Sequence, residues 1–338
     1  MNILITGGFG SIGEYVIKEC LARGHNVSVF EVHNQRTAKL AKLYSKKNVK
    51  VFFGDIRKYD DVKKAVTAQD AIIHMAAILP PASEASPQLC KEVNVNGTAN
   101  VIKSIQEENS GQILVEISSA SVMGFTQNRT PPVKPYDAVS PTDHYSNSKV
   151  EVESMVRNSG LKYCILRLAA VMPTYMGIPK MLKMIKVIFD MPLNARCEIV
   201  YDIDVAYALA AAVENLSGSS ELSGKIGFIG GGRQNNCQIV VKEMLGSVFK
   251  SMGLGMPNES LFPSDGNSYY LDWYDTDEIQ SILKYQRHSF EQWRSEFIKS
   301  YRLLRPFIKL FRKPIIKYIE FLSPQYVTYK GASCCQEL

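Results

Sequence analysis

The chain opens with Met1-Asn-Ile-Leu-Ile-Thr-Gly-Gly-Phe-Gly-Ser-Ile-Gly13, and these residues decide its fold. The apolar run Met1–Thr6 predicts a short buried strand, and a helical pattern follows the glycines from Glu14 to Arg23. Glycine is needed where a backbone turns tightly and where a pyrophosphate approaches main-chain N–H groups at a helix N-terminus. Strand, glycine turn and helix therefore predict the first unit of a dinucleotide-binding domain.

An acidic residue follows at the spacing that such a domain uses. The predicted strand 26–31 ends in Glu31, 18 residues after Gly13. A carboxylate at this point can accept hydrogen bonds from the hydroxyls of an adenosine ribose. It would repel a 2′-phosphate, so Glu31 favours NAD over NADP, although the neighbouring Arg36 weakens this preference.

Strands and helices alternate through the first 120 residues. Strands are predicted at 2–6, 26–31, 49–54, 70–75 and 112–118, with helices near 12–23, 35–46, 58–67 and 85–109. This alternation predicts an α/β fold, a doubly wound parallel sheet of the Rossmann type with a small C-terminal substrate lobe. Ligands of such sheets bind beyond the carboxyl ends of the strands, where the candidate polar groups of this chain also fall.

A second candidate feature is a tyrosine followed by a lysine four residues later. The pattern occurs three times, at Tyr59/Lys63, Tyr145/Lys149 and Tyr326/Lys330, so by itself it carries little information. Only the middle copy follows a strand that ends in hydroxyl residues, Gln112–Ser119. Residues i and i+4 share one face of a helix, so the ammonium of Lys149 can lower the pKa of the Tyr145 phenol and make it a usable acid or base.

The composition is that of an ordinary soluble globular enzyme, with 46% hydrophobic and 21% charged residues among 338. No secretory signal is expected, because the N-terminal strand lacks a basic segment and a cleavage site, and no apolar run is long enough to span a bilayer. Seven scattered cysteines indicate reduced thiols and therefore a cytoplasmic protein. His33, His74 and His144 lack the spacing of metal ligands, so no metal is expected.

The positive charge is concentrated near the C-terminus. The net charge is +6, and the segment Lys299–Lys317 alone holds seven Lys and Arg residues and no Asp or Glu. The rest of the chain is close to neutral, which argues against a nucleic-acid-binding body. Any electrostatic partner is therefore expected at the C-terminal region.

Over about residues 1–290 the chain resembles the extended short-chain dehydrogenase/reductase family, typified by NAD-dependent epimerases and dehydratases. The matching segments occur in the family's order: Thr6–Gly13, Gly54–Arg57, His74–Ala77, Asn94–Thr98, Ser118–Gly124, Tyr145–Lys149, Leu166-Arg167, Asp204–Ala206 and Ile229–Gly232. Order and spacing together make this resemblance specific.

The resemblance implies a role for each matching residue. Tyr145 is expected to be the general acid/base, Lys149 to hold the nicotinamide ribose, and Ser119 to orient the reacting hydroxyl or carbonyl. The family's NAD-binding positions correspond here to Gly7, Gly10, Ser11, Ile12, Gly13, Glu31, Asp55, Ile56, Ala76, Ala77, Asn94, Tyr145 and Lys149. The expected cofactor is NAD, with NADP less favoured, and the expected partner is a small-molecule substrate.

The same resemblance divides the chain into three parts. The NAD(P)-binding core is expected at 1–170, with 198–232 returning to it. The substrate lobe is expected at 171–197 and 233–290, and a basic amphipathic extension at 291–338.

The substrate stays open between two classes. The favoured reading is a nucleotide sugar, handled by an epimerase or dehydratase. The alternative is an apolar ketone or alcohol, as in 3β-hydroxysteroid dehydrogenases or dihydroflavonol reductases. Met123 and Ala170 stand where nucleotide-sugar members often carry a tyrosine and an asparagine, and Arg196 is the candidate replacement for a phosphate-binding arginine. A third reading, a non-catalytic NAD(P) sensor, is disfavoured by the retained Ser119, Tyr145 and Lys149.

The C-terminal segment also has two interpretations. Residues 299–323 interleave aliphatic and aromatic residues with basic ones, and Pro306 and Pro314 are expected to divide them into short helices. Such a pattern is typical of a peripheral contact with an anionic membrane. The alternative, which is slightly favoured, is that these helices pack on the protein's own lobe or on the partner of a homodimer.

Overall fold

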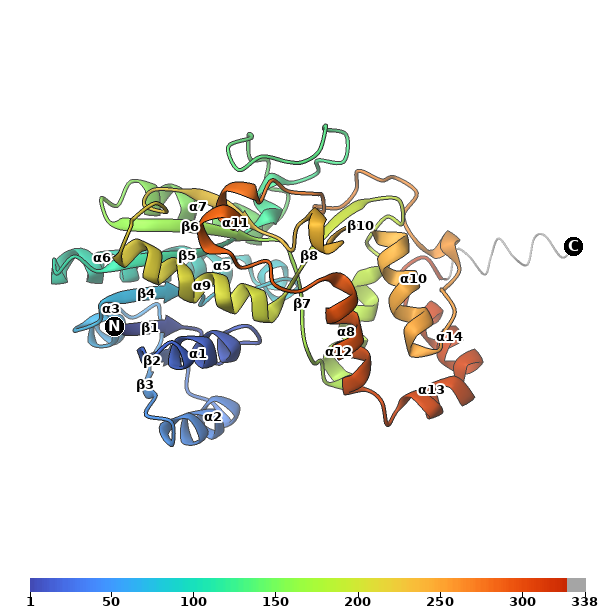
Figure 1. Ribbon diagram of the computed structural model, residues 1–338, viewed down its shortest axis with the longest axis horizontal. Helices are drawn as coiled ribbons and strands as arrows, with labels where there is room; N and C mark the ends of the chain where they lie inside the picture. Colours follow the sequence, from blue (N-terminus) through green and yellow to red (C-terminus); the bar gives the residue numbers. More distant parts are fainter. Residues whose placement is uncertain (327–338) are drawn as a thin grey trace, which may run out of the picture.

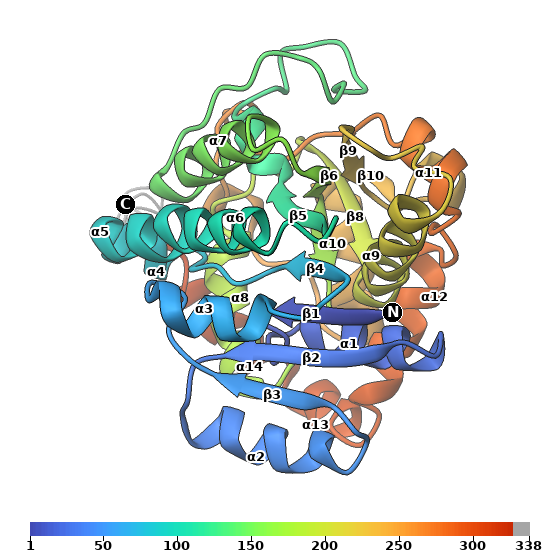
Figure 2. The same cartoon turned by 90° about the vertical axis from the view of Figure 1, so that its left-hand side faces the viewer.

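Seven parallel strands form the central sheet of the computed structural model, which describes residues 1–326. Their order is β3-β2-β1-β4-β5-β6-β9, as seen in Figure 2. The strands are β1 (Asn2–Thr6), β2 (Asn26–Glu31), β3 (Lys50–Phe53), β4 (Ala71–His74), β5 (Ile113–Ser119), β6 (Lys162–Leu168) and β9 (Ile226–Ile229). The predicted doubly wound α/β fold is confirmed.

Helices cover both faces of this sheet because its strands are apolar on both sides. Ile3 and Ile5 pack with one set of helices and Leu4 with the other. The first set is α1 (Gly13–Ala22), α9 (Asp202–Ser217) and α11 (Asp277–Leu283). The second set is α3 (Tyr59–Val66), α6 (Gly97–Glu108) and α7 (His144–Arg157). Helix α2 (Gln35–Ser45) connects β2 to β3 at the sheet edge.

The helix predicted over 85–109 is observed over residues 87–108, and Ser86 separates it from the short helix α4 (Ala82–Ala85). It consists of α5 (Pro87–Cys90), a π-helical turn η1 (Lys91–Asn96) and α6. Pro87 starts a new helix because its fixed φ suits a first turn and it cannot continue the preceding one. The π turn places Asn94 on the side of α7, and such turns are frequent at functional sites.

A second lobe occupies the right half of Figure 1. Its three-stranded sheet has the order β10 (Gln238–Val240), β8 (Arg196–Tyr201), β7 (Ala170–Met172). We expected residues 198–232 to return to the core. For β8 this is wrong, because β6 already pairs with β5 and β9 and offers no free edge. Helix α9 and strand β9 of that segment do lie on the large sheet.

The helices of the second lobe are α8 (Ile178–Ile188), α10 (Val241–Met252), α12 (Phe290–Ser300), α13 (Arg305–Leu310) and α14 (Arg312–Phe321). Trp293, Phe297 and Ile319 of the predicted extension 291–338 are buried in the core of this lobe. The described part of that extension, residues 291–326, therefore contributes to the lobe; residues 327–338 lie outside the described residues. Pro306 and Pro314 lie in the first turns of α13 and α14, as predicted. In the described part of the chain, we find no helix with the length and apolar character needed to cross a bilayer.

Candidate active site

Ser119 and Tyr145 meet at the carboxyl end of the central sheet. Ser119 ends β5, and its hydroxyl hydrogen-bonds to the phenol of Tyr145 in the first turn of α7. The start of α7 is fixed by a capping box, in which Asp143 accepts from the main-chain N–H of Ser146 at 2.6 Å. Glu84 adds a second anchor, since its carboxylate accepts from the main-chain N–H of Tyr145 at 3.2 Å. The phenol is thereby held beside the strand end.

The pKa of Tyr145 is raised in this structure. Burial of the phenol is the largest cause, while the charge of Lys149 and the hydrogen bond from Ser119 act in the opposite direction. The predicted lowering by Lys149 is therefore present, but burial outweighs it in the protein without cofactor.

Lys149 is held by a partner that sequence reasoning missed. Its ammonium lies 3.2 Å from Oε1 of Glu116 and donates to the carbonyl of Ile117 at 2.5 Å. Both Lys149 and Glu116 are buried. Because an ammonium has three N–H groups, one remains for the hydroxyls of a nicotinamide ribose. The signal in the sequence was an acidic residue inside an otherwise apolar strand.

Glu116 is an acidic side chain buried within the otherwise largely apolar strand β5. Within the described part of the chain, its Oε2 atom has no hydrogen-bond partner. Burial, opposed by the charge of Lys149, raises the pKa of Glu116 to about 7. The pKa of Lys149 is raised as well. Burial of the ammonium lowers this pKa, but the nearby charge of the Glu116 carboxylate, together with smaller contributions, raises it by more. The pair thus keeps the lysine charged while the carboxyl titrates near neutrality.

The glycine turn lies against the end of β4. A Cβ atom on Gly7, which has a φ of +67°, would stand 3.0 Å from Cα of Ala76. A Cβ atom on Gly13 would stand 2.4 Å from the carbonyl oxygen of Gly8, so only glycine fits there. Ser11 and Ile12 precede α1, and no side chain caps that helix. Its N-terminal N–H groups therefore suit a pyrophosphate.

Glu31 closes the other side of this turn. Its carboxylate accepts from the main-chain N–H of Phe9 at 3.2 Å and of Val32 at 3.0 Å. These bonds use backbone donors and fix the carboxylate where β2 ends beside the glycines. This position is compatible with the predicted role of Glu31 as acceptor for the hydroxyls of an adenosine ribose.

The segment after β3 holds Asp55 and Ile56, the expected adenine contacts. Arg57 donates hydrogen bonds to both carboxylates: its Nη2 atom lies 2.6 Å from Oδ2 of Asp55, and its Nη1 atom lies 3.2 Å from Oε2 of Glu92. The hydrogen bond from Arg57 is the main cause of a lowered pKa for Asp55. Asp55 is therefore an ionised acceptor, with part of its capacity used by Arg57.

Asn94 and the segment Ala76-Ala77, the expected nicotinamide contacts, lie beyond the carboxyl end of β4. Asn94 accepts from the main-chain N–H of Ile78 at 2.7 Å and donates to Ser148 of α7 at 3.0 Å. It thus ties the chain after β4 to the helix that carries Tyr145. The structure brings the predicted residues of both the catalytic and the cofactor group to one edge of the sheet.

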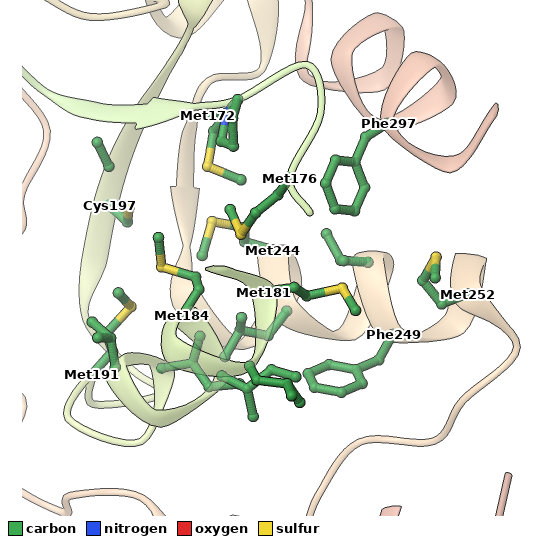
Figure 3. A pocket seen from close by; sticks show the side chains of 18 of the residues that line it. Met172, Met176, Met181, Met184, Met191, Cys197, Met244, Phe249, Met252 and Phe297 are labelled. Carbon is green, nitrogen blue, oxygen red and sulfur yellow. The ribbon is translucent and has the colours of Figure 1, made fainter. Parts of the chain in front are cut away.

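A large cavity leads from Ser119 into the second lobe. Its volume is about 910 Å³, and methionines from several elements point into it, as Figure 3 shows. Seven methionines line it: Met172, Met176, Met181, Met184, Met191, Met244 and Met252. Among the residues that the structure describes, no Lys, Arg, Asp, Glu or His side chain lines this cavity. The lining residues that carry a hydroxyl are Ser119, Ser121, Tyr269, Tyr270, Tyr274 and Tyr318.

Arg196 does not enter this cavity. Its guanidinium binds the buried carboxylate of Asp272 at 2.6 Å and the carbonyls of Gln127 and Arg129. Its Nε and Nη2 donors are used within the protein, which disfavours the hypothesis that Arg196 replaces a phosphate-binding arginine. Sequence could not show this, because Asp272 is 76 residues away.

Comparison with known proteins finds one matching family and several more distant relatives. The profile of the NAD dependent epimerase/dehydratase family matches residues 3–221. The Homo sapiens sterol-4-alpha-carboxylate 3-dehydrogenase, decarboxylating, is 26% identical over 234 residues, covering 65% of this chain and 60% of the relative. The Homo sapiens 3 beta-hydroxysteroid dehydrogenase type 7 is 32% identical over 143 residues, covering 40% of this chain and 38% of the relative. The chain thus spans about three fifths of the length of the first of these relatives.

Among solved structures, a double mutant of dTDP-glucose 4,6-dehydratase from Streptomyces venezuelae superposes with a TM-score of 0.73. It is 23% identical and covers 91% of this chain and 98% of its own. At this identity the similarity shows a shared fold, which extends over both lobes.

Proposed function

The chain belongs to the NAD-dependent epimerase/dehydratase family of extended short-chain dehydrogenases/reductases, and we propose that it interconverts an alcohol and a ketone on an apolar, lipid-like molecule. The observation that carries this proposal is the cavity next to Ser119, whose described lining bears no charge. It favours the substrate class of the 3β-hydroxysteroid dehydrogenases over that of the nucleotide-sugar enzymes.

The catalytic part of the proposal rests on Ser119, Tyr145 and Lys149. Bound NAD would supply the acceptor for the hydride leaving the carbon of the alcohol. Ser119 would hydrogen-bond the substrate oxygen, and Tyr145 would take the hydroxyl proton as that oxygen becomes a carbonyl. Lys149 would hold the ribose and, through its charge, ease ionisation of the phenol. In the opposite direction Tyr145 returns the proton.

The cofactor part rests on the glycine turn and Glu31. The Gly7–Gly13 turn and the uncapped N-terminus of α1 suit a pyrophosphate. The Glu31 carboxylate suits the ribose hydroxyls of NAD and would repel the phosphate of NADP. Asp55, Ile56, Ala76, Ala77 and Asn94 complete the proposed cofactor contacts.

The charge balance of the cavity argues for an apolar substrate. A nucleotide sugar carries a diphosphate, which proteins hold with arginines, lysines or helix N-termini. The described cavity lining offers no such cation, and the candidate predicted from the sequence, Arg196, is bound to Asp272. Burying a diphosphate there would leave its charges unpaired at a cost of several kcal/mol.

Thermal shift in the presence of NAD tests this substrate class. We expect 3-hydroxysteroids or long-chain secondary alcohols to raise the melting temperature, and UDP- and TDP-sugars to leave it unchanged. Met181→Lys, which places a charge in the cavity, should remove the shift, whereas Met181→Leu should keep it. A shift with a nucleotide sugar and none with the apolar compounds would refute the proposal.

We also propose that the protein contacts an anionic membrane through residues 299–323. Leu303, Phe307 and Leu310 are 85%, 68% and 75% exposed, and basic residues surround them. Exposed apolar groups with interspersed Lys and Arg suit a lipid interface. The cysteines in the described residues are free and buried, which supports a cytoplasmic setting for this contact.

Flotation with vesicles tests the membrane contact. The protein should float with vesicles containing about one fifth phosphatidylglycerol, and less with neutral ones, because cationic residues gain roughly 1 kcal/mol each at an anionic surface. Leu303→Glu/Leu310→Glu should abolish flotation. If the surface instead joins two copies, light scattering will show a dimer that these substitutions split, and flotation will be absent throughout.

A further inference from the structure

The cavity reaches the surface between two groups of helices. Several residues that line it are also exposed to solvent, which places them at its mouth. On α8 these are Ile178 and Met184, and on the opposite side they are Leu304, Phe307, Phe311 and Tyr318. The mouth is therefore apolar on both sides. Ordinarily such a rim is polar, because water wets it.

The mouth lies inside the surface that we propose for membrane contact. Phe307 and Phe311 belong both to the cavity lining and to the segment 299–323, and Leu303 and Leu310 stand beside them on the same segment. Figure 1 shows α13 and α14 together at one end of the second lobe. A membrane that binds this segment would therefore cover the mouth.

Charge on this face favours lipid headgroups. Lys183 and Lys186 lie on α8, and Arg305, Lys309 and Arg312 on the other side of the mouth. Glu320 is the acidic residue of α14, and it accepts a hydrogen bond from the main-chain N–H of Asn258 at 3.0 Å. The helices that border the mouth thus carry more basic than acidic residues, as binding to an anionic lipid surface requires.

We infer that the substrate passes directly between the lipid bilayer and the catalytic groups through this mouth. The inference rests on the proposed apolar substrate. Exposing apolar surface to water is unfavourable, so a route that never leaves an apolar environment avoids that barrier. The cavity supplies such a route, because its described lining is uncharged from Phe307 at the surface to Ser119 at the reacting end.

Trp293 provides a reporter for this route. It lines the cavity and is buried, and the chain has two tryptophans, so Trp273→Phe leaves Trp293 as the single one. A dibrominated stearyl alcohol quenches tryptophan fluorescence on contact. We would present this probe either in anionic vesicles or dispersed in detergent, to the Trp273→Phe protein without any assay of turnover.

Vesicle-borne probe should quench Trp293 rapidly. Leu303→Glu/Leu310→Glu, which changes exposed residues outside the cavity lining, should slow quenching from vesicles by about tenfold or more and leave quenching from detergent unchanged. Leu43→Glu, at an exposed leucine of α2 far from the mouth, is the matched control and should alter neither.

The two failures are distinguishable. Equal quenching rates from vesicles for the parent protein and the Leu303→Glu/Leu310→Glu variant would refute the direct route from the bilayer. The proposal of an apolar substrate would be unaffected by that result. Absence of quenching from both vesicles and detergent would show that the cavity takes no apolar ligand, and the proposed function would fall with the route.

Discussion

The ammonium of Lys149 lies 3.2 Å from the carboxylate of Glu116, and both side chains are buried next to the strand end that carries Ser119. A buried ammonium without a counter-charge tends to lose its proton, and the carboxylate prevents this. Glu116 is connected to the site by its ion pair with Lys149. It is a positioning residue that acts through Lys149.

Glu116→Gln should change the pH profile of the reaction. Without the carboxylate the pKa of Lys149 falls, so the lysine becomes neutral at a lower pH and no longer assists ionisation of Tyr145. The alkaline limb of the kcat profile should move to lower pH, with kcat lowered by roughly tenfold at the alkaline end. NADH titration by fluorescence should show the same displacement in the pH dependence of binding. Identical profiles for both proteins would contradict this role.

The same substitution should alter the pH dependence of stability. The pKa of Glu116 is about 7 in the folded protein against an ordinary value of 4.5, so the folded state binds this proton more tightly than the unfolded state. Its contribution to the free energy of unfolding is present at low pH and is lost as pH rises from about 4.5 to 7. Urea unfolding of both proteins across this range should show a shallower loss for Glu116→Gln. Glu198, whose pKa burial also raises to about 7, remains in both proteins and cancels in the comparison.

Tyr145→Phe should remove the acid/base and little else. We expect turnover to fall by roughly 10²–10⁴-fold, because the substrate oxygen loses its proton acceptor. The affinity for NAD, measured by titration, should change little, since the ring and Lys149 remain. Turnover equal to that of the parent protein would show that the phenol is not the acid/base.

Glu31→Ala should relax the choice of cofactor. In the parent protein the Glu31 carboxylate lies at the end of β2 beside the glycine turn, where it accepts hydrogen bonds from the main-chain N–H groups of Phe9 and Val32. Its removal takes away both the acceptor for the ribose hydroxyls and the repulsion of a 2′-phosphate. The ratio of the Kd values for NADP and NAD should fall, and a parent protein that already prefers NADP would refute our interpretation of Glu31.

Gly13→Ala should disturb the turn that we assign to the pyrophosphate. The new Cβ would stand 2.4 Å from the carbonyl oxygen of Gly8, so the turn must shift. We expect the Kd for NAD to rise by about tenfold or more, which corresponds to about 1.4 kcal/mol. Gly255→Ala is the control, because a Cβ there meets nothing within 4 Å, and it should bind NAD like the parent protein.

Local signals were sufficient to predict the sheet and its ligand-binding edge. The apolar run before Gly7 and the acid at Glu31 depend on spacing within about thirty residues, and the strand after each helix follows from the same short-range alternation. The Ser119, Tyr145 and Lys149 arrangement was also predictable, because the end of a strand and the first turns of a helix fix it.

Contacts between distant residues were not predictable in this way. The pairing of β8 with β7 and β10 depends on which sheet edges are already occupied. The capture of Arg196 by Asp272, and the burial of Glu116 against Lys149, join residues from separate elements. The cavity likewise draws its walls from α8, α10 and the C-terminal helices, so its character appeared only in three dimensions.

The methionines that line the cavity should make ligand binding by the protein sensitive to oxidants. Thioether side chains are flexible and adapt their shape to a guest, but peroxide converts them into polar sulfoxides. Met184, exposed at the mouth, would react before those deeper inside. Under oxidative stress the cavity should therefore lose affinity for apolar molecules, while Ser119, Tyr145 and Lys149 remain chemically intact. A methionine sulfoxide reductase should restore this affinity.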